Sequence, residues 1–312
     1  MSSSTSSFRG FVLAFCTVFA IGACAFVVGS ELLVRFVVAP VDDYARYKAF
    51  FHSARAPVAM FGDSHVANAI ENGPAVANLG YPGESLGLML LKARTYVEEG
   101  RGKRIVLQFS PEQFAIYRAA KDQSSVADDL LQRNEPWLQF MRPHFRGYLL
   151  GYWRAFLRDP GVVFAARAEP AHGAAEEVKS FASWPKEAQR RDAELRVQLH
   201  APLPQGGTVE ALVAQIDAAL REFKKRGVES CIVEYPLSSA YRAAAALAPT
   251  FAAMRARMKR LADSERVRYV DLTEAMPDTE FWDPDHVAAG SRGTATRLVI
   301  EGCFGAGEGG AR

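Results

Sequence analysis

The sequence predicts an α/β fold: a doubly wound parallel sheet of about five strands with a large helical insertion, preceded by one N-terminal transmembrane helix. Three observations predict it. Short β-rich runs alternate with helical patterns after residue 57, a rhythm typical of βαβ units. Residues 112–207 interrupt that rhythm, and an uncharged apolar run lies near the start of the chain.

The composition fits one main globular domain. A chain of 312 residues that is 49% apolar can bury one large core, or one core with an appended subdomain. Lysine and arginine number 37 against 35 acidic residues, a net charge of +2. The chain therefore lacks the positive field that attracts nucleic acid, and we expect no nucleic-acid partner.

The apolar run covers residues 11–29 and contains no charged side chain. A helix of about 20 such residues crosses a hydrocarbon core of about 30 Å. We therefore interpret residues 1–39 as an N-terminal tail and membrane anchor, and residues 40–312 as the globular domain. Residues 21–24, Ile-Gly-Ala-Cys, resemble a lipoprotein cleavage box, which is the alternative, although the chain stays apolar beyond them.

The charges around the anchor bear on its orientation. Arg9 lies before the apolar run, and Arg35, Arg46 and Lys48 follow it. Because basic residues near the ends of a span favour the cytoplasmic side, this pattern slightly favours a cytoplasmic domain.

Four cysteines are present. Cys16 and Cys24 belong to the apolar run, which leaves Cys231 and Cys303 in the globular part. No CxxC pair exists, so neither a zinc knuckle nor a redox motif is indicated. Cys231 lies in a strand-like run typical of core, and a bridge between it and Cys303 is left open.

The predicted elements form a flavodoxin-like order of strands and helices. Strands are expected at residues 58–61, 76–79, 104–109, 229–235 and 267–272. Helices are expected at residues 85–99, 208–226, 249–263 and 288–301. Gly100 and Gly227 fit the ends of two of these helices.

The insertion at residues 112–207 is rich in aromatic residues and arginines, contains several prolines, and shows no clear strand. It is too long for an ordinary loop, so we expect it to be mostly helical. Its aromatic residues either form a small core of their own or belong to a lid or a surface that docks a partner.

The first candidate for chemistry is Ser64, in Gly62-Asp63-Ser64-His65 directly after the first predicted strand. Open α/β sheets bind their ligands at the carboxyl ends of the strands, so this is a suitable position for a nucleophile. The alternative is that Ser64 only caps the next helix.

The second candidate is Asp283-Pro284-Asp285-His286, which follows the last predicted strand. A turn can bring the Asp283 carboxylate onto one nitrogen of His286, so that the other nitrogen faces the serine. The alternative is an Asp-Pro-Asp turn with a surface histidine. Together with Ser64, the two motifs converge on one sheet edge if the sheet is wound as predicted.

Two neighbours are weaker candidates. His65 is adjacent to Ser64, and Asp285 is adjacent to His286, so their side chains diverge from the groups that they would have to reach. Asp63 fits a structural role in its turn. No metal-ligand spacing or glycine-rich phosphate loop is present, so we expect no metal and no cofactor.

These motifs resemble those of the SGNH/GDSL hydrolase superfamily, over residues 57–110 and 208–301. Its first block matches Gly62-Asp63-Ser64, its second-block glycine matches Gly80, and its last block matches Asp283-Pro284-Asp285-His286. The resemblance implies a triad of Ser64, His286 and Asp283, with an oxyanion hole made by the backbone N–H groups of Ser64 and Gly80.

The third block departs from the family. Where the family has Gly-x-Asn-Asp, this chain has Gln108-Phe109-Ser110-Pro111-Glu112-Gln113. Either Gln113 supplies the third oxyanion donor as an amide, or that donor is absent.

The anchor, the Gly-Asp-Ser-His block and the insertion are similar to those of membrane-anchored SGNH proteins that work beside multi-pass O-acyltransferases in polysaccharide O-acetylation and teichoic-acid D-alanylation. The resemblance implies a multi-pass membrane O-acyltransferase as partner and a polysaccharide as acceptor. It also implies an anchor in the inner (cytoplasmic) membrane and a domain in the periplasm or cell exterior. We follow it against the charge pattern, because a short tail carrying Arg9 commonly stays inside.

Three functions are compatible with these residues. The first is an acyltransferase that takes an acetyl or similar group onto Ser64 and passes it to a glycan hydroxyl. The second is an esterase that removes acyl groups from a glycan or lipid by the same acyl-enzyme step. The third is a catalytically silent scaffold that positions a glycan for another enzyme.

Overall fold

The computed structural model describes residues 5–121, 123–132, 137–159, 180–204 and 206–305. The chain forms two compact units. One contains Met1–His52 and Asp128–Glu176, and the other contains Ser53–Ala127 and Glu177–Arg312. This division differs from the predicted boundary at residue 40, and it distributes the predicted insertion over both units.

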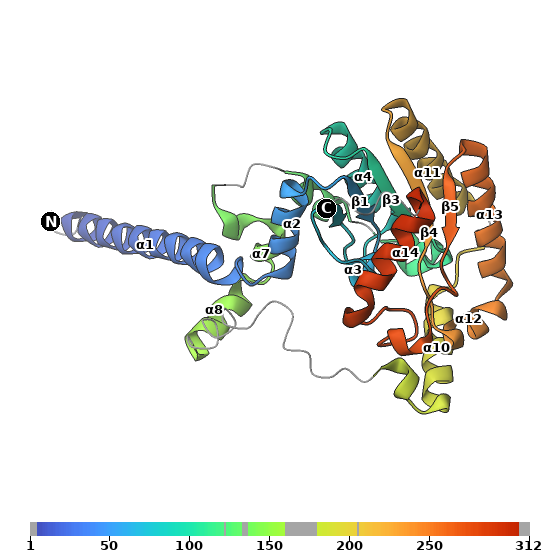
Figure 1. Ribbon diagram of the computed structural model, residues 1–312. Helices are drawn as coiled ribbons and strands as arrows, with labels where there is room; N and C mark the ends of the chain where they lie inside the picture. Colours follow the sequence, from blue (N-terminus) through green and yellow to red (C-terminus); the bar gives the residue numbers. More distant parts are fainter. Residues whose placement is uncertain (1–4, 122, 133–136, 160–179, 205, 306–312) are drawn as a thin grey trace. The chain divides into compact units, whose positions relative to one another are not determined.

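The second unit is built on one parallel sheet of five strands in the order β2-β1-β3-β4-β5 (Figure 1). The strands are β1 Val58–Phe61, β2 Val76–Asn78, β3 Arg104–Gln108, β4 Glu229–Glu234 and β5 Arg268–Asp271. Val58 of β1 lies opposite Val76 of β2 and Arg104 of β3. This is the flavodoxin-like strand order, so the predicted fold class is confirmed.

Helices cover both faces of the sheet. On one face, α3 (Ser64–Ala69) and α14 (Arg292–Phe304) contribute to a core that contains Met60 and Val106. The opposite face packs against α4 (Leu86–Glu98), α11 (Gly207–Lys225) and α13 (Pro249–Glu265). Because the central strands are buried on both faces, their sequences are continuous apolar runs rather than alternating ones.

A disulfide joins Cys231 of β4 to Cys303 of α14. Both cysteines are buried. The bridge that the sequence left open is therefore present, and it ties the last helix to the centre of the sheet.

The described part of residues 112–207 is helical, apart from an isolated bridge between Ala115 and Pro202. Within the second unit it supplies η2 (Pro111–Phe114), α5 (Ile116–Ala119), η4 (Phe181–Ser183) and α10 (Lys186–His200). The helix α10 packs against α12 (Ser239–Ala246), where Val197 joins a small apolar cluster with Tyr241 and Phe251. This contact holds α10 beside the edge of the sheet at which the carboxyl ends of the strands lie.

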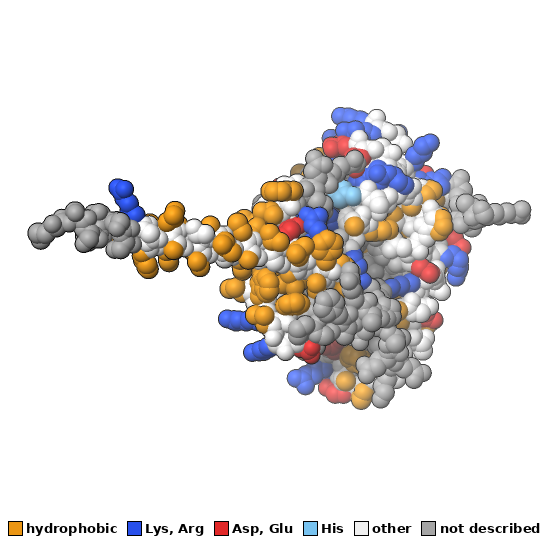
Figure 2. All heavy atoms as spheres, turned by 90° about the vertical axis from the view of Figure 1, so that its left-hand side faces the viewer, with side chains coloured by type: hydrophobic (Ala, Val, Ile, Leu, Met, Phe, Trp, Pro, Cys, Tyr) orange, Lys and Arg blue, Asp and Glu red, His pale blue; other side chains and the backbone are white. Residues whose placement is uncertain are grey.

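The first unit begins with α1 (Thr5–Leu33), which continues as a π-helical stretch, η1 (Val34–Val38). Residues Phe8–Val38 are long and apolar enough to cross a membrane, and Figure 2 shows apolar side chains along this helix. The unit also contains α2 (Asp43–Ser53), η3 (Gln139–Met141), α7 (Pro143–Arg146) and α8 (Leu149–Arg158), and α6 (Ser124–Leu131) crosses into it.

Buried polar contacts centre on Asp129 in this unit. Its carboxylate accepts hydrogen bonds from Tyr44 (2.8 Å) and from Arg142 (2.8 and 3.0 Å). Phe140 and Phe145 are buried with Val34, whereas Trp137 is 89% exposed. Part of the predicted insertion's aromatic content therefore forms a small core, and part of it faces outward.

Candidate active site

The turn after β1 presents Ser64 at the carboxyl end of the sheet. Gly62 must be glycine, because a Cβ there would lie 2.2 Å from Val66 and 2.3 Å from the Gln108 amide oxygen. Asp63 is the N-cap of α3, and its side chain accepts from the N–H of His65. Ser64 is thus the first residue of α3 rather than its cap, and its side chain is left for other contacts.

The second turn brings the base to the serine. One oxygen of Asp283 accepts from the backbone N–H groups of Asp285 (3.0 Å) and His286 (2.8 Å). The other oxygen lies 2.8 Å from Nδ1 of His286, and Nε2 of the same ring lies 2.9 Å from Oγ of Ser64. With the proton on Nδ1, the ring can accept the hydroxyl proton of Ser64.

The fold therefore brings Ser64 to His286, which is 222 positions away in the chain, and His286 contacts Asp283. These are the contacts that the sequence predicted. This arrangement can raise the nucleophilicity of a serine hydroxyl, because the base removes its proton as the oxygen attacks. Their assignment as catalytic residues stays a prediction.

Trp282 covers one side of the base. Its ring stacks on the His286 imidazole, with centroids 5.4 Å apart and planes inclined by 17°. The indole remains 37% exposed. The sequence alone does not identify Trp282, because a single aromatic residue in a turn carries no signal of its own.

The three predicted oxyanion donors differ in their hydrogen-bond partners. The N–H of Ser64 begins α3 and has no hydrogen-bond partner among the described residues. The N–H of Gly80 donates to the Oδ1 atom of Asn78 at 3.0 Å. The Gln113 amide donates to Asp63 at 2.8 Å, and the residue is buried. Only Ser64 presents an unpaired donor of this set.

The assignment of Gln113 as a third oxyanion donor stays a prediction. In this structure its amide donates to the carboxylate of the nucleophile turn. Gly80 is also required for packing. A Cβ there would lie 2.6 Å from the backbone nitrogen of Ala67, so the glycine lets β2 approach α3 closely.

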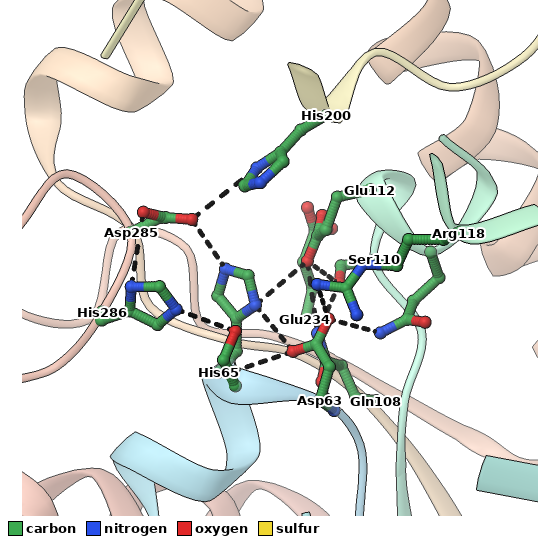
Figure 3. A network of polar contacts seen from close by, with 12 residues as sticks. Asp63, His65, Gln108, Ser110, Glu112, Arg118, His200, Glu234, Asp285 and His286 are labelled. Carbon is green, nitrogen blue, oxygen red and sulfur yellow. Dashed lines mark hydrogen bonds and ion pairs between the residues drawn. The ribbon is translucent and has the colours of Figure 1, made fainter. Parts of the chain in front are cut away.

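Behind Ser64 lies a buried cluster of charges around Asp63 (Figure 3). Arg118 contacts its Oδ2 atom at 2.9 Å, and His65 contacts its Oδ1 atom at 2.8 Å. Burial alone would raise the pKa of Asp63, but the charges of His65 and Arg118 lower it well below its usual range. Asp63 is therefore an ionised structural residue, as expected from the sequence.

The strand β3 contributes to the same cluster. The side-chain oxygen Oε1 of Gln108 accepts from the N–H of Asp63 at 2.9 Å, and its Nε2 atom donates to Ser110 (3.1 Å) and Glu112 (3.2 Å). Ser110 also donates to Glu112. Residues 108–113, which differ from the family's third block, therefore support the turn that carries Ser64.

His65 does not act as the base for Ser64, which agrees with the expectation from the sequence. Its Nδ1 atom faces Asp63, and its Nε2 atom lies 3.4 Å from Oδ2 of Asp285 (Figure 3). Burial alone would lower the pKa of His65, but Asp63 and Asp285 raise it well above its usual range. The ring is therefore a cation held between two carboxylates.

Asp285 is the second carboxylate that contacts His65. Burial alone would raise the pKa of Asp285, whereas its ion pair with His65 and the charge of His286 lower it below its usual range. His200 of α10 lies 3.6 Å from its Oδ2 atom. Burial lowers the pKa of His200, and its Nδ1 atom lies 2.9 Å from the Tyr241 hydroxyl.

Arg196 of α10 contacts both acidic residues of the base turn. Its guanidinium lies 3.0 Å from Asp283 and 3.2 Å from Asp285. Burial alone would lower the pKa of Arg196, but these two charges raise it. Arg196 was not predicted from the sequence, because α10 carries charges along its whole length and only the fold shows which one faces the turn.

Two groups of side chains are close enough to share a metal ion: His65 with Asp285 and His286, and Asp63 with His65 and Glu112. His65 belongs to both. Because its raised pKa keeps a proton on the ring, an ion would have to displace that proton. We assign the cluster to charge pairing.

No protein-family model matches the chain, and no curated protein matches it either. Solved structures that resemble it include a lipase/acylhydrolase from Enterococcus faecalis, at 10% identity and a TM-score of 0.39, with 79% of this chain and 94% of that chain covered. A GDSL-like lipase from Bacteroides thetaiotaomicron VPI-5482 matches at 10% identity and a TM-score of 0.40, with 84% and 97% covered. A likeness this distant carries no argument about chemistry, which rests on the contacts of Ser64, His286 and Asp283.

Proposed function

We propose that this chain is a membrane-anchored acyltransferase of the SGNH/GDSL kind, which O-acylates, and most simply O-acetylates, a cell-surface or exported polysaccharide. The observation that carries the proposal is the hydrogen-bonded series from Ser64 through His286 to Asp283. The same series serves transfer and hydrolysis, which differ only in the nucleophile that resolves the acyl-enzyme.

The proposed reaction has two halves. Ser64 Oγ attacks the acyl carbonyl while Nε2 of His286 takes the hydroxyl proton, and His286 then returns that proton to the leaving group. In the second half, a glycan hydroxyl gives its proton to His286 and attacks the acyl-serine, and Ser64 regains a proton as it leaves. Asp283 holds the imidazole in orientation throughout. The N–H of Ser64 stabilises the oxyanion in both halves.

The location that we propose is the inner membrane, with the sheet unit in the periplasm or cell exterior. The disulfide between Cys231 and Cys303 supports this side, because disulfides persist in oxidising compartments. A multi-pass membrane O-acyltransferase is the partner that we propose as the source of acyl groups, and the polysaccharide is the acceptor.

The partition of the acyl group tests this function. The full chain in lipid nanodiscs would be given nitrophenyl acetate with and without an oligosaccharide acceptor, and both acetate and acetylated sugar would be quantified. We expect slow release of acetate alone and acetylated sugar when the acceptor is present, with neither product from Ser64→Ala. Fast acetate release that the acceptor does not divert would identify an esterase, and no reaction at all would leave a scaffold.

A further inference from the structure

The helix formed by α1 and η1 is longer than a membrane span requires. The apolar segment Phe8–Val38 has 31 residues, whereas about 20 residues cross a hydrocarbon core of about 30 Å at 1.5 Å per residue. Roughly ten residues are therefore available to lie at or beyond a membrane surface.

The C-terminal turns of this helix belong to the core of the first unit. Val34 is fully buried with Phe140, Phe145 and Leu149. The Trp153 indole of α8 donates to the Ser30 hydroxyl at 3.0 Å. The helix α8 therefore packs against the end of the candidate span and is held at that level along it.

The surface of α8 is apolar where it faces away from this core. Leu150 is 69% exposed and Leu157 is 74% exposed. Seven residues separate them, which is about two helical turns, so both side chains lie on one face. Leu32 and Phe36 on the span are half exposed as well. Figure 2 shows apolar side chains along the span and around its end.

The charges of α8 are all basic. Its sequence, LLGYWRAFLR, contains Arg154 and Arg158 and no acidic residue. Both arginines are exposed, and they lie beside the Leu150 and Leu157 face on the helix circumference. A short helix that exposes leucines and carries arginines along one border of that face is typical of helices that lie in a membrane surface.

We propose that α8 lies in the boundary between headgroups and acyl chains of the membrane that α1 enters. Leu150 and Leu157 face the acyl chains, and Arg154 and Arg158 extend to anionic headgroups. Lipid is the occupant that the observations favour, because Trp153 holds α8 against the end of the candidate span and the arginines that flank the exposed leucines are complementary to phosphate. The first unit is thereby attached to the membrane surface at a second element besides its span.

Spin labels on opposite faces of α8 test this proposal. In the full chain with Cys16→Ala and Cys24→Ala, a label at Leu157→Cys would be compared with one at Ala155→Cys, which lies about 160° away around the same helix. Leu150→Cys supplies a second reading of the lipid face. The protein would be reconstituted in vesicles of phosphatidylethanolamine and phosphatidylglycerol, and label collisions with oxygen and with a water-soluble nickel chelate would be measured.

We expect the labels at positions 150 and 157 to collide with oxygen in preference to nickel, and the label at position 155 to show the opposite preference. Equal preferences on the two faces would overturn the proposal, since α8 would then lie wholly in water or wholly in the acyl chains rather than at their boundary. Immobile labels at positions 150 and 157 that neither reagent reaches would also overturn it, because a protein surface would then cover this face.

Discussion

Nε2 of His65 lies 3.4 Å from Oδ2 of Asp285, and this contact joins the helix that carries the serine to the turn that carries the base. Ser64 precedes His65, and His286 follows Asp285. The ion pair therefore acts one residue away from each end of the Ser64–His286 hydrogen bond. We expect it to set the distance across which the proton moves.

Breaking the contact should lower kcat while leaving KM nearly unchanged. His65→Asn and Asp285→Asn each remove one charge of the pair and let the two turns separate. Because Asp285 keeps Arg196 and His65 keeps Asp63 as a partner, the loss of stability should be smaller than the roughly 3–5 kcal/mol of an uncompensated buried charge. Because a misplacement of about 1 Å can cost about 100-fold in rate, we expect losses of up to that size towards nitrophenyl acetate. The double variant should lose little more than either single variant. Additive losses would show that the two residues act separately.

The same pair should make stability depend on pH. A histidine with a raised folded pKa contributes stability fully below its unfolded pKa of about 6.5, and loses it as the pH rises through the folded value. Asp285 has a lowered pKa, so its contribution is lost only at acid pH. The difference in melting temperature between the wild type and His65→Asn should therefore be largest near pH 6 and shrink at alkaline pH. A difference that grows with pH would contradict this assignment.

Arg196 should hold the base turn in position. Its guanidinium contacts Asp283 at 3.0 Å and Asp285 at 3.2 Å. In Arg196→Gln, kcat towards nitrophenyl acetate should fall, because the turn that carries His286 loses these contacts. A partly exposed ion pair is worth about 0.2–1 kcal/mol, so we expect a loss of less than about tenfold.

Arg190→Gln is the matched control on the same helix. Arg190 is exposed and pairs with Glu187 and Glu194, away from the base turn. The kcat of Arg190→Gln should equal that of the wild type. Equal losses in the two variants would point to the helix α10 as a whole rather than to the Arg196 charge.

The disulfide should stabilise the sheet unit. It closes a loop of 72 residues between Cys231 and Cys303, and bridges of this kind typically contribute about 2–4 kcal/mol. Urea unfolding of the Cys231→Ser, Cys303→Ser double variant should show a loss of that size, whereas Cys16→Ala with Cys24→Ala should show none. Two additional free thiols in the untreated wild type would contradict the bridge.

The sequence predicted the elements that bury apolar runs on both faces, which is why β1, β3 and β4 were placed to within a residue. It also predicted the meeting of Ser64 with Asp283 and His286, because the two motifs follow strands of one parallel sheet. The short helix α3 was missed, since its six residues show no helical period.

The supporting charges could not be predicted in the same way. Arg118 and Arg196 come from helices of the insertion, and which arginine faces the site depends on packing that no local pattern encodes. Gln113 was assigned as an oxyanion donor by type and position alone. Its amide lies 2.8 Å from Asp63, a contact made across 50 residues of chain that only the fold reveals.

The central claim is that Ser64 carries the acyl group, and intact-protein mass spectrometry after acid quenching tests it most directly. The full chain would be mixed with nitrophenyl acetate, quenched within seconds, and mapped by peptide digestion. We expect one added acetyl group on the peptide that contains Ser64, and no adduct in Ser64→Ala or His286→Ala, because triad residues act as a unit. An acetyl group on another residue, or an undiminished adduct in His286→Ala, would contradict the account.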